Sequence, residues 1–523
     1  MTDMLASNLG AMLVSVARKH RSLNALWCKG TYTTYEELFS NAISIAASIA
    51  QHCPVEPYDR IAIFAEKETP AYTAIIASLL AGGGYVPLNP RFPLARNRDI
   101  LIESGARVLI CDEKHRSELE ELLQGDNQVE LILLPDSVEH AAVDLPQQLR
   151  GDIELLTLDA RSVGEGRDGG LAYLFFTSGS TGKPKGVPIT HSNVFAYLQG
   201  IRSFCAFESD DRVLQLFDLS FDLSVHDLFL TWMAGACLFS APENSVLLST
   251  RIVKEFGITA WTSVPSTAGW LKQSKQLGTD ALPSLRHSFF CGEALPGSVA
   301  QAWAEAACNS DVYNIYGPTE ATVAISWFLF QRSDNPPAVV SLGFPLPGQQ
   351  LGLYTEEGKQ AGEMGEICLS GSQVMSGYWQ NPELTSKRFF EADGARWYRT
   401  GDLGRFDPTE GFLYAGRADH QVKIRGYRVE LQEIEHVVRE LAGADLVAVL
   451  PWAAEEGAMP KGCIAFVRDL GRPDQALIEE ARLRLPEYMV PLKVVSVDDM
   501  PTNTNGKIDY RALAAHPVMA QKH

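Results

Sequence analysis

Three absences in the sequence exclude whole classes of protein. The longest apolar stretch, residues 71–88, contains three glycines and a proline, so it predicts a core helix and a strand, not a membrane span. The net charge of -19, from 45 basic and 64 acidic residues, offers no broad basic face to nucleic acid. The nine cysteines are scattered without a C-x-x-C pair, which argues against a disulfide framework or a zinc site.

The N-terminus also lacks a basic segment followed by an apolar block, so we expect no signal peptide. Scattered cysteines fit a reducing compartment. We therefore expect a cytoplasmic protein without a nucleic-acid or membrane partner.

The chain of 523 residues is long enough for two to four domains. Strand-like and helix-like segments alternate from residue 60 and again from residue 171, which predicts parallel sheets covered by helices on both faces. From about Val340 to Phe412 helical patterns disappear and short β segments dominate. We expect an α/β fold: a large N-terminal domain of wound sheets (residues 1–415) with a β-rich subdomain (about 340–415), and a small α+β C-terminal domain (420–523).

The most informative stretch follows the apolar run at residues 171–176, which predicts a buried strand. Glycines, hydroxyls and two lysines follow it, and together they suit the binding of a phosphate. A Walker A loop is excluded because Gly179 and Gly182 are too close together and Pro184 follows Lys183. A flexible linker is the alternative. The predicted phosphate loop comprises Thr177, Ser178, Gly179, Ser180, Thr181, Gly182, Lys183 and Lys185.

Three further motifs carry charged side chains suited to nucleotide chemistry, each with a simpler alternative. Glu320 follows a strand and could hold Mg²⁺, or merely cap a helix. Asp402 follows a turn glycine, and its carboxylate could accept hydrogen bonds from the hydroxyls of a ribose or only form the turn. Lys507, on a polar loop, could neutralise a phosphate or be a surface charge.

These motifs occur in one order along the chain, at residues 177–186, 316–320, 398–402, 416–426 and 505–507. Supporting matches lie at residues 34–38, 81–88 and 485–491. This set resembles the adenylate-forming (AMP-binding) superfamily, and within it the amino-acid adenylation domains of nonribosomal peptide synthetases. The resemblance covers essentially the whole chain. It implies a hinge at residues 416–419, centred on Asp419, and a mobile C-terminal lid domain carrying Lys507.

The resemblance also implies a two-step reaction. A carboxylate attacks the α-phosphorus of ATP·Mg²⁺, and a phosphopantetheine thiol on a carrier protein then displaces AMP. Lys507 and Glu320 would be the catalytic residues, with Glu320 the metal ligand. Nucleotide contacts would come from the phosphate loop together with Asn314, Tyr316, Thr319, Asp402 and Arg417.

The acyl pocket is carried over from the same resemblance. Its expected lining is Asp222, Leu223, His226, Thr262, Phe289, Cys291, Gly292, Ile315, Val323 and Ala324. A carboxylate at position 222 would pair with an ammonium and so indicates an amino acid, although Asp222 could instead cap the following helix.

The substrate stays open at this point. Residues 220–225 and 289–294 look like D-alanine–carrier-protein ligases, and Phe289, Cys291 and Ile315 would narrow the pocket toward a small side chain. His226 and Thr262 depart from an aliphatic lining, so a polar substrate or an anthranilate-type amino-aryl acid is also compatible.

Because the sequence ends twelve residues after Arg511, we expect a free-standing enzyme that loads a separate carrier protein in trans, in nonribosomal peptide or antibiotic biosynthesis. An acyl- or aryl-CoA ligase shares the nucleotide motifs. A non-enzymatic adenylate-binding scaffold is a third hypothesis, disfavoured because Lys507, Glu320 and Asp402 are all present.

Overall fold

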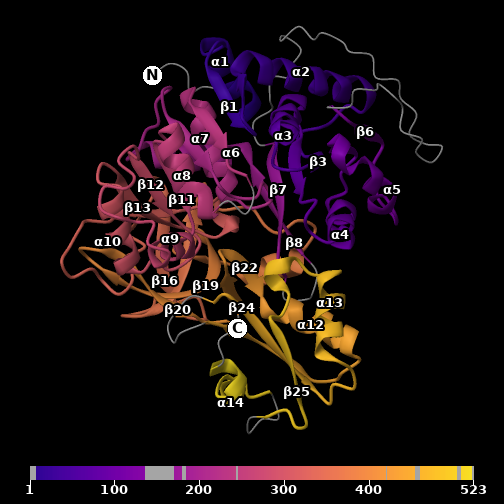
Figure 1. The fold of residues 1–523 in the computed structure, drawn as a ribbon, viewed down its shortest axis with the longest axis vertical. Helices are drawn as coiled ribbons and strands as arrows, with labels where there is room; N and C mark the ends of the chain where they lie inside the picture. Colours follow the sequence, from indigo (N-terminus) through magenta and orange to yellow (C-terminus); the bar gives the residue numbers. More distant parts are fainter. Residues whose placement is uncertain are drawn as a thin grey trace. The chain divides into compact units, whose positions relative to one another are not determined.

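The computed structural model describes residues 8–135, 170–179, 184–242, 246–419, 421–453, 460–502 and 508–520. The chain divides into two compact units (Figure 1). The first comprises residues 1–90, 101–175 and 186–416, and the second residues 91–100, 176–185 and 417–523.

The described strands of the first unit include a nine-stranded mixed sheet in which β9 to β13 and β1 pair in parallel and both edges are antiparallel. In spatial order its strands are β15 (Phe344–Pro345), β14 (Ser326–Leu329), β13 (Asp311–Tyr316), β12 (His287–Phe290), β11 (Ala260–Ser263), β9 (Arg212–Gln215), β10 (Cys237–Ser240), β1 (Asn24–Cys28) and β2 (Thr31–Thr34).

A second wound sheet has six strands within the described ranges. Its order is β6 (Leu131–Leu133), β5 (Val108–Cys111), β3 (Arg60–Phe64), β4 (Gly84–Leu88), β7 (Leu171–Thr177) and β8 (Lys185–Thr190). The pairs from β6 to β7 are parallel, as the strand–helix alternation predicts.

The helices beside these sheets begin where the sequence offers start signals. Thr34 forms a capping box with Glu37 at the start of α2, and Pro70 occupies the first turn of α3. The helices are α1 (Leu9–Lys19), α2 (Tyr35–His52), α3 (Thr69–Ala81), α4 (Leu94–Ser104), α5 (Leu119–Leu122), α6 (His191–Arg202), α7 (Leu223–Ala234), α8 (Val246–Phe256), α9 (Pro265–Gln273) and α10 (Gly297–Ala306).

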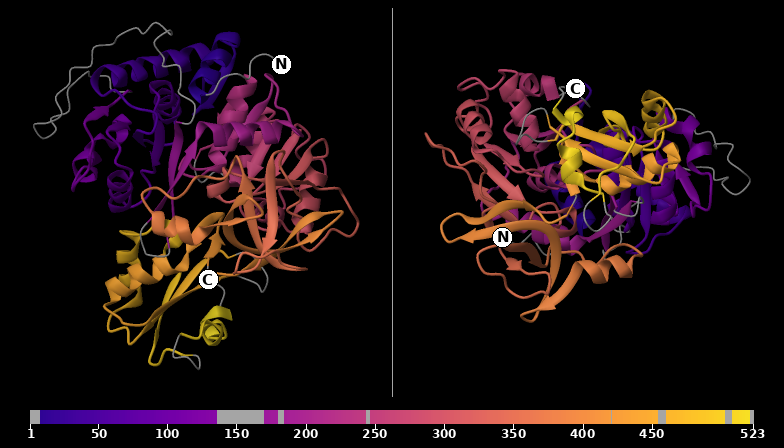
Figure 2. Two further views of the ribbon diagram at one scale, coloured as in Figure 1. Left: turned by 180° about the vertical axis from the view of Figure 1, so that it is seen from behind. Right: turned by 90° about the horizontal axis from the view of Figure 1, so that it is seen from below.

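The β-rich segment is an antiparallel five-stranded sheet, drawn in orange (Figures 1 and 2). Its strands are β16 (Gln349–Tyr354), β17 (Gly365–Gly371), β18 (Phe389–Ala392), β19 (Ala395–Asp407) and β20 (Gly411–Arg417). The prediction that helices disappear after Val340 is wrong at α11 (Pro382–Arg388), where Asn381 caps a short helix with Pro382 in its first turn.

The second unit contains a hairpin and a three-stranded sheet. Its elements are β21 (Gln421–Ile424), β22 (Tyr427–Glu430), α12 (Leu431–Ala442), β23 (Val447–Trp452), β24 (Gly462–Arg468), α13 (Asp474–Arg482), β25 (Lys493–Val497) and α14 (Tyr510–Ala514). β23 and β24 are antiparallel, while β24 and β25 are parallel. α12 and α13 pack together and against this sheet, which has its own apolar core.

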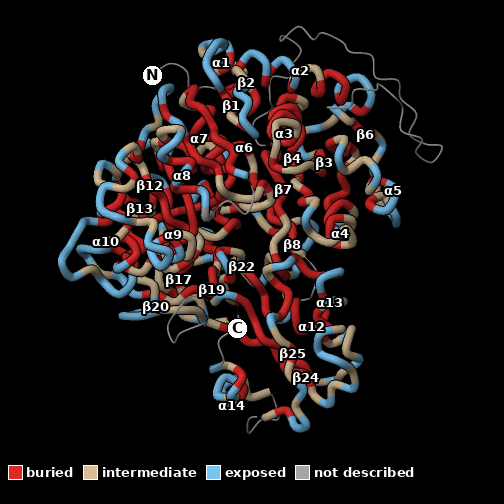
Figure 3. The backbone as a smooth tube through the Cα atoms, in the orientation of Figure 1, coloured by how far each residue is buried: buried red, intermediate tan, exposed pale blue. Residues whose placement is uncertain are grey.

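The buried residues of the first unit follow its sheets and the inner faces of its helices (Figure 3). α7 is buried over almost its whole length and packs on β9 and β10. Such a helix holds its side chains firmly, because rotamer changes there would open voids. It therefore suits a site that needs fixed geometry.

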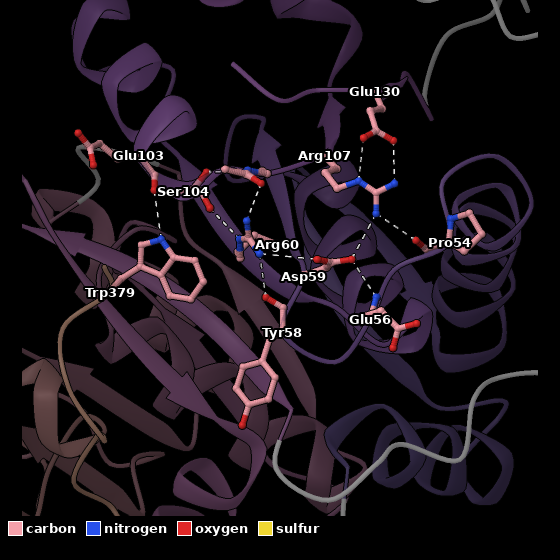
Figure 4. A network of polar contacts seen from close by, with 12 residues as sticks. Pro54, Glu56, Tyr58, Asp59, Arg60, Glu103, Ser104, Arg107, Glu130 and Trp379 are labelled. Carbon is pink, nitrogen blue, oxygen red and sulfur yellow. Dashed lines mark hydrogen bonds and ion pairs between the residues drawn. The ribbon is translucent and has the colours of Figure 1, made fainter. Parts of the chain in front are cut away.

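A polar network ties the β-rich segment to the six-stranded sheet (Figure 4). Arg60 donates hydrogen bonds to the carbonyl oxygens of Ser104 and Gly105, each at 2.7 Å. The indole of Trp379 lies 4.8 Å from the Arg60 guanidinium and donates to the carbonyl of Glu103 at 3.1 Å. Further contacts in this network join Arg107 to Glu130, Asp59 and Pro54.

Two expected absences can be compared with the described part of the chain. No helix within the described ranges is long and apolar enough to cross a membrane. All nine cysteines lie in those ranges and are free thiols there.

Trp303 provides a test of the core. It is fully buried, its ring lies 4.7 Å from that of Trp261, and its indole N–H donates to Ser288 at 2.9 Å. We expect Trp303→Ala to lower the free energy of unfolding by about 3–5 kcal/mol in chemical denaturation, because it leaves a large cavity. The control is Trp270→Ala, which removes a ring that is 36% exposed and should cost less than about 1 kcal/mol. Equal losses would contradict this account of the core.

Candidate active site

Three strands bring two predicted acyl-pocket residues, Thr262 and Phe289, beside Tyr313 through their parallel register. Thr262 on β11 pairs with Phe289 on β12, and Phe289 pairs with Tyr313 on β13, so the three side chains share one face of the sheet. The rings of Phe289 and Tyr313 stack at 5.1 Å. α7 then places the His226 ring 4.6 Å from Phe289.

The apolar members of the predicted pocket belong to one buried cluster. Leu223, Phe289, Cys291, Ile315, Val323 and Ala324 all lie in it. The Cys291 sulfur is 4.0 Å from the carbonyl oxygen of Val323, and Gly292 adopts a positive φ of 90° that favours glycine. The structure therefore gathers these residues from separate strands and loops.

Asp222 occupies the N-cap position of α7, but its side chain makes no capping hydrogen bond there. The residue is 6% exposed. Burial, with added repulsion from the Asp222 carboxylate, raises the pKa of the Tyr173 phenol well above its usual range, which places the carboxylate near that ring. The carboxylate thus lies among buried side chains instead of serving the helix end.

His226 is held by a residue that sequence analysis did not single out. The Tyr197 hydroxyl on α6 lies 2.5 Å from His226 Nδ1. Burial lowers the pKa of His226 to about 3, so the imidazole is neutral at physiological pH. A single tyrosine in an amphipathic helix gives no sequence signal that it will contact a histidine from a later helix.

Asp227, the next residue of α7, is a second residue that the sequence analysis did not single out. Burial raises the pKa of its carboxyl well above the usual range, and the neighbouring Thr262 hydroxyl and Lys67 charge oppose this only in part. His226 Nε2 is buried without a hydrogen-bond partner in the structure. A carboxylate in a fully buried helix was the available signal, because such groups are rarely buried without a function or a partner.

The loop after β13 is strained where it reaches the predicted pocket. Thr322 and Val323 adopt positive φ values of 57° and 70°, which cost β-branched residues about 1–3 kcal/mol each. The buried Gln373 side chain donates to the carbonyl of Ala324 at 2.7 Å, and Thr322 donates back to the Gln373 carbonyl at 2.7 Å. Gln373 thereby fixes the loop that carries Val323 and Ala324.

Two predicted nucleotide residues contact each other directly. Tyr316 donates its hydroxyl hydrogen to Asp402 Oδ2 at 2.6 Å, and both residues are more than nine-tenths buried. The Asn314 side-chain amide donates to the carbonyl of Ser341 at 2.7 Å. The Asn314 side-chain oxygen is therefore the atom that would contact a nucleotide. Thr319 begins the short 3₁₀ turn η2 (Thr319–Ala321).

Glu320 is fully buried within that turn. Its Oε1 accepts a hydrogen bond from Tyr378 at 2.7 Å, and the Tyr378 and Tyr398 hydroxyls are 3.1 Å apart. Among the described residues there is no group of three or more His, Cys, Asp or Glu side chains that could hold a metal alone. A single buried carboxylate fits Mg²⁺ that is shared with substrate phosphates, because Mg²⁺ commonly uses one or two protein carboxylates in such sites.

The phosphate loop is described at its two ends, within the second unit. Ser178 donates to the carbonyl of Arg428 at 2.8 Å, and the Gly179 N–H donates to the Glu433 carboxylate at 3.2 Å. Glu433 also pairs with the buried Arg96 at 2.5 Å. The loop amide therefore already binds an anionic oxygen, which is the chemistry expected of a phosphate site.

The remaining predicted residues of the second unit do not form one cluster among the described contacts. The Thr177 hydroxyl is buried without a hydrogen-bond partner, and Lys185 is 9% exposed on β8. Arg417 and Asp419 form a two-bond ion pair at 2.7 and 2.9 Å. Ser180, Thr181, Gly182, Lys183 and Lys507 lie outside the described residues.

Comparisons with known proteins agree on one family. A family model described as AMP-binding enzyme matches residues 13–379. The D-alanine–D-alanyl carrier protein ligase of Bacillus licheniformis is 31% identical over 495 residues, covering 92% of this chain and 93% of that protein. A plipastatin synthase chain of Bacillus subtilis is 32% identical over 488 residues, but these are 92% of this chain and only 18% of that much longer protein.

A solved structure is similar over nearly its full length. The Vibrio cholerae adenylation domain AlmE, in complex with glycyl-adenosine-5′-phosphate, has 33% sequence identity to this chain. The TM-score is 0.87, with 97% of this chain and 96% of that chain covered.

The buried imidazole of His226 generates a prediction about acid stability. The unfolded chain binds a proton at this histidine below about pH 6.5, whereas the folded pKa is about 3. The free energy of unfolding should therefore fall as pH decreases from 6.5 toward 3, by about 1.4 kcal/mol per unit from this group. His226→Gln should flatten this slope in denaturation curves. His436→Gln, whose side chain is 46% exposed, should not, and equal slopes would contradict the buried neutral imidazole.

Proposed function

Because the chain belongs to the AMP-binding, adenylate-forming enzymes, we propose that it activates an amino acid as an acyl-adenylate. It then transfers the acyl group to the phosphopantetheine thiol of a separate carrier protein. The setting is nonribosomal peptide or related secondary-metabolite biosynthesis, including antibiotics. The relatives that carry D-alanine to a carrier protein or bind glycyl-adenosine-5′-phosphate support an amino-acid substrate.

The observation that carries the proposal is the buried Asp222 carboxylate. It is 6% exposed and does not cap α7, although it occupies the N-cap position. A carboxylate excluded from water is stabilised by a positively charged partner. The ammonium group of an amino acid supplies that partner, whereas a fatty or aryl acid does not.

The reaction requires little covalent chemistry from the chain. Binding holds the substrate carboxylate in line with the α-phosphorus of ATP, and the entering oxygen displaces pyrophosphate. Asp222 fixes the amine end of the substrate. Tyr316 and Asp402 hold the adenine and ribose, with Asn314, Thr319 and Arg417 as additional nucleotide contacts. Lys507 offsets the negative charge that gathers around the α-phosphate.

Glu320 and the phosphate loop act on the rest of the nucleotide. Glu320 would hold Mg²⁺, which supplies charge neutralisation for the phosphate oxygens. The loop at residues 177–185 binds the β- and γ-phosphates, whose release completes the first half-reaction. In the second half-reaction the carrier thiol attacks the acyl carbonyl and AMP leaves, with residues 416–419 as the hinge between the N-terminal and C-terminal domains.

An acyl- or aryl-CoA ligase is the second candidate, since it would use the same nucleotide residues. Asp222 disfavours it because an acid without an amine offers this buried carboxylate no ammonium group to pair with. An anthranilate-type acid does carry an amine and stays within the proposal.

Asp222→Asn tests the amino-acid assignment. We expect the variant to lose about a hundredfold in kcat/KM for the amino acid in substrate-dependent pyrophosphate exchange, because an amide cannot pair with an ammonium. The panel comprises glycine, D- and L-alanine, serine, proline, β-alanine and anthranilate. Asp210→Asn, at a side chain 77% exposed, is the matched control and should behave as the wild type. The proposal would be overturned if none of the amine-bearing acids in this panel supported pyrophosphate exchange.

Lys507→Ala tests the mechanism separately from the substrate. Loss of the positive charge at the α-phosphate should lower the rate of adenylate formation by about 10²–10³, with an unchanged unfolding transition. Lys461→Ala, at an exposed lysine of the same unit, serves as the control. Undiminished adenylation in the Lys507 variant would remove this residue from the mechanism.

A further inference from the structure

An unsatisfied polar atom lies beside the predicted acyl pocket. His226 Nε2 lacks a hydrogen-bond partner, the residue is 0% exposed, and its ring lies 4.6 Å from that of Phe289. A buried polar atom without a partner costs about 1–3 kcal/mol, so native structures rarely keep one without a reason. Its position beside Phe289 points to a polar ligand group there.

The hydrogen-bonding role of His226 follows from Tyr197. The phenol hydroxyl is fully buried, and the partner that the structure gives it is His226 Nδ1 at 2.5 Å. Since this nitrogen is the acceptor available to the phenol hydrogen, Nδ1 is unprotonated and the neutral ring carries its hydrogen on Nε2. Nε2 is therefore a hydrogen-bond donor without an acceptor.

The spacing of this donor from Asp222 limits the size of the group that it contacts. Asp222 and His226 are four residues apart at the start of α7, and Asp222 has helical backbone angles. Residues at this spacing lie on the same face of a helix, one turn apart, roughly 6 Å along the axis. A short molecule with an ammonium and a hydroxyl three bonds apart can contact both.

We infer that the substrate is an amino acid with an oxygen on its β-carbon, of the serine type, and that this oxygen accepts a hydrogen bond from His226 Nε2. Tyr197 is a positioning residue that holds His226 in the donating tautomer. This inference rests on the proposed amino-acid activation and specifies its substrate class.

Two substrates of nearly equal shape test the inference. Serine and 2-aminobutyrate differ by a hydroxyl in place of a methyl group, and each is assayed as its L and D form by pyrophosphate exchange. We expect kcat/KM for one enantiomer of serine to exceed that for the matching aminobutyrate by about tenfold or more, because the analogue leaves the buried His226 Nε2 donor unpaired.

Three variants separate hydrogen bonding from packing. His226→Leu should bring the serine-to-aminobutyrate ratio close to one, whereas His226→Gln, which keeps an N–H donor, should restore part of it. Tyr197→Phe should lower the ratio mainly by reducing kcat/KM for serine; a purely structural role would reduce both substrates equally. Trp270→Ala, at a 36% exposed ring outside the predicted pocket, is the control and should keep the wild-type ratio.

The outcomes also distinguish this inference from the proposed function. If aminobutyrate, alanine or glycine is activated as well as serine, the proposed function stands and the β-oxygen inference fails. An unchanged ratio in His226→Leu would likewise overturn it. If no amine-bearing acid supports exchange, the proposed function itself fails.

Discussion

The parallel pairing of β11, β12 and β13 is the constraint on which the predicted acyl pocket depends. It sets Thr262, Phe289 and Tyr313 side by side on one face of the sheet, and α7 lays His226 against them. A slip of one residue in any strand would turn its side chain to the opposite face. The backbone hydrogen bonds between these strands therefore determine which side chains face the predicted pocket.

The β-rich segment supports the same region from outside the wound sheets. Tyr378 and Asp402 are both in or beside its strands, and they hold Glu320 and Tyr316 through hydrogen bonds of 2.7 and 2.6 Å. The residues proposed to bind metal and nucleotide are therefore oriented by a sheet that contributes none of the acyl-pocket lining. Such supporting hydrogen bonds keep reactive groups in position at little entropic cost on binding.

Much of the architecture could be predicted from hydrophobic periodicity and capping signals. The alternation from residue 60 predicts β3, α3 and β4 closely, and Thr34 marks the start of α2. α11 was missed because seven residues are too few to show an apolar period, despite Asn381 and Pro382 at its start. The contact of Tyr197 with His226 and the positive φ of Val323 depend on tertiary packing, which no local pattern encodes.

The strained turn at Thr322 and Val323 has a consequence for redesign of specificity. Gln373 bonds the backbone of this turn from a segment far along the chain, so Val323 and Ala324 are not independent positions. Exchanging them for larger residues alters a loop already held in an unfavourable conformation, and the effect will depend on residue 373. Libraries that aim to change the substrate should vary these three positions together, whereas Phe289 lies on a regular strand and can be varied alone.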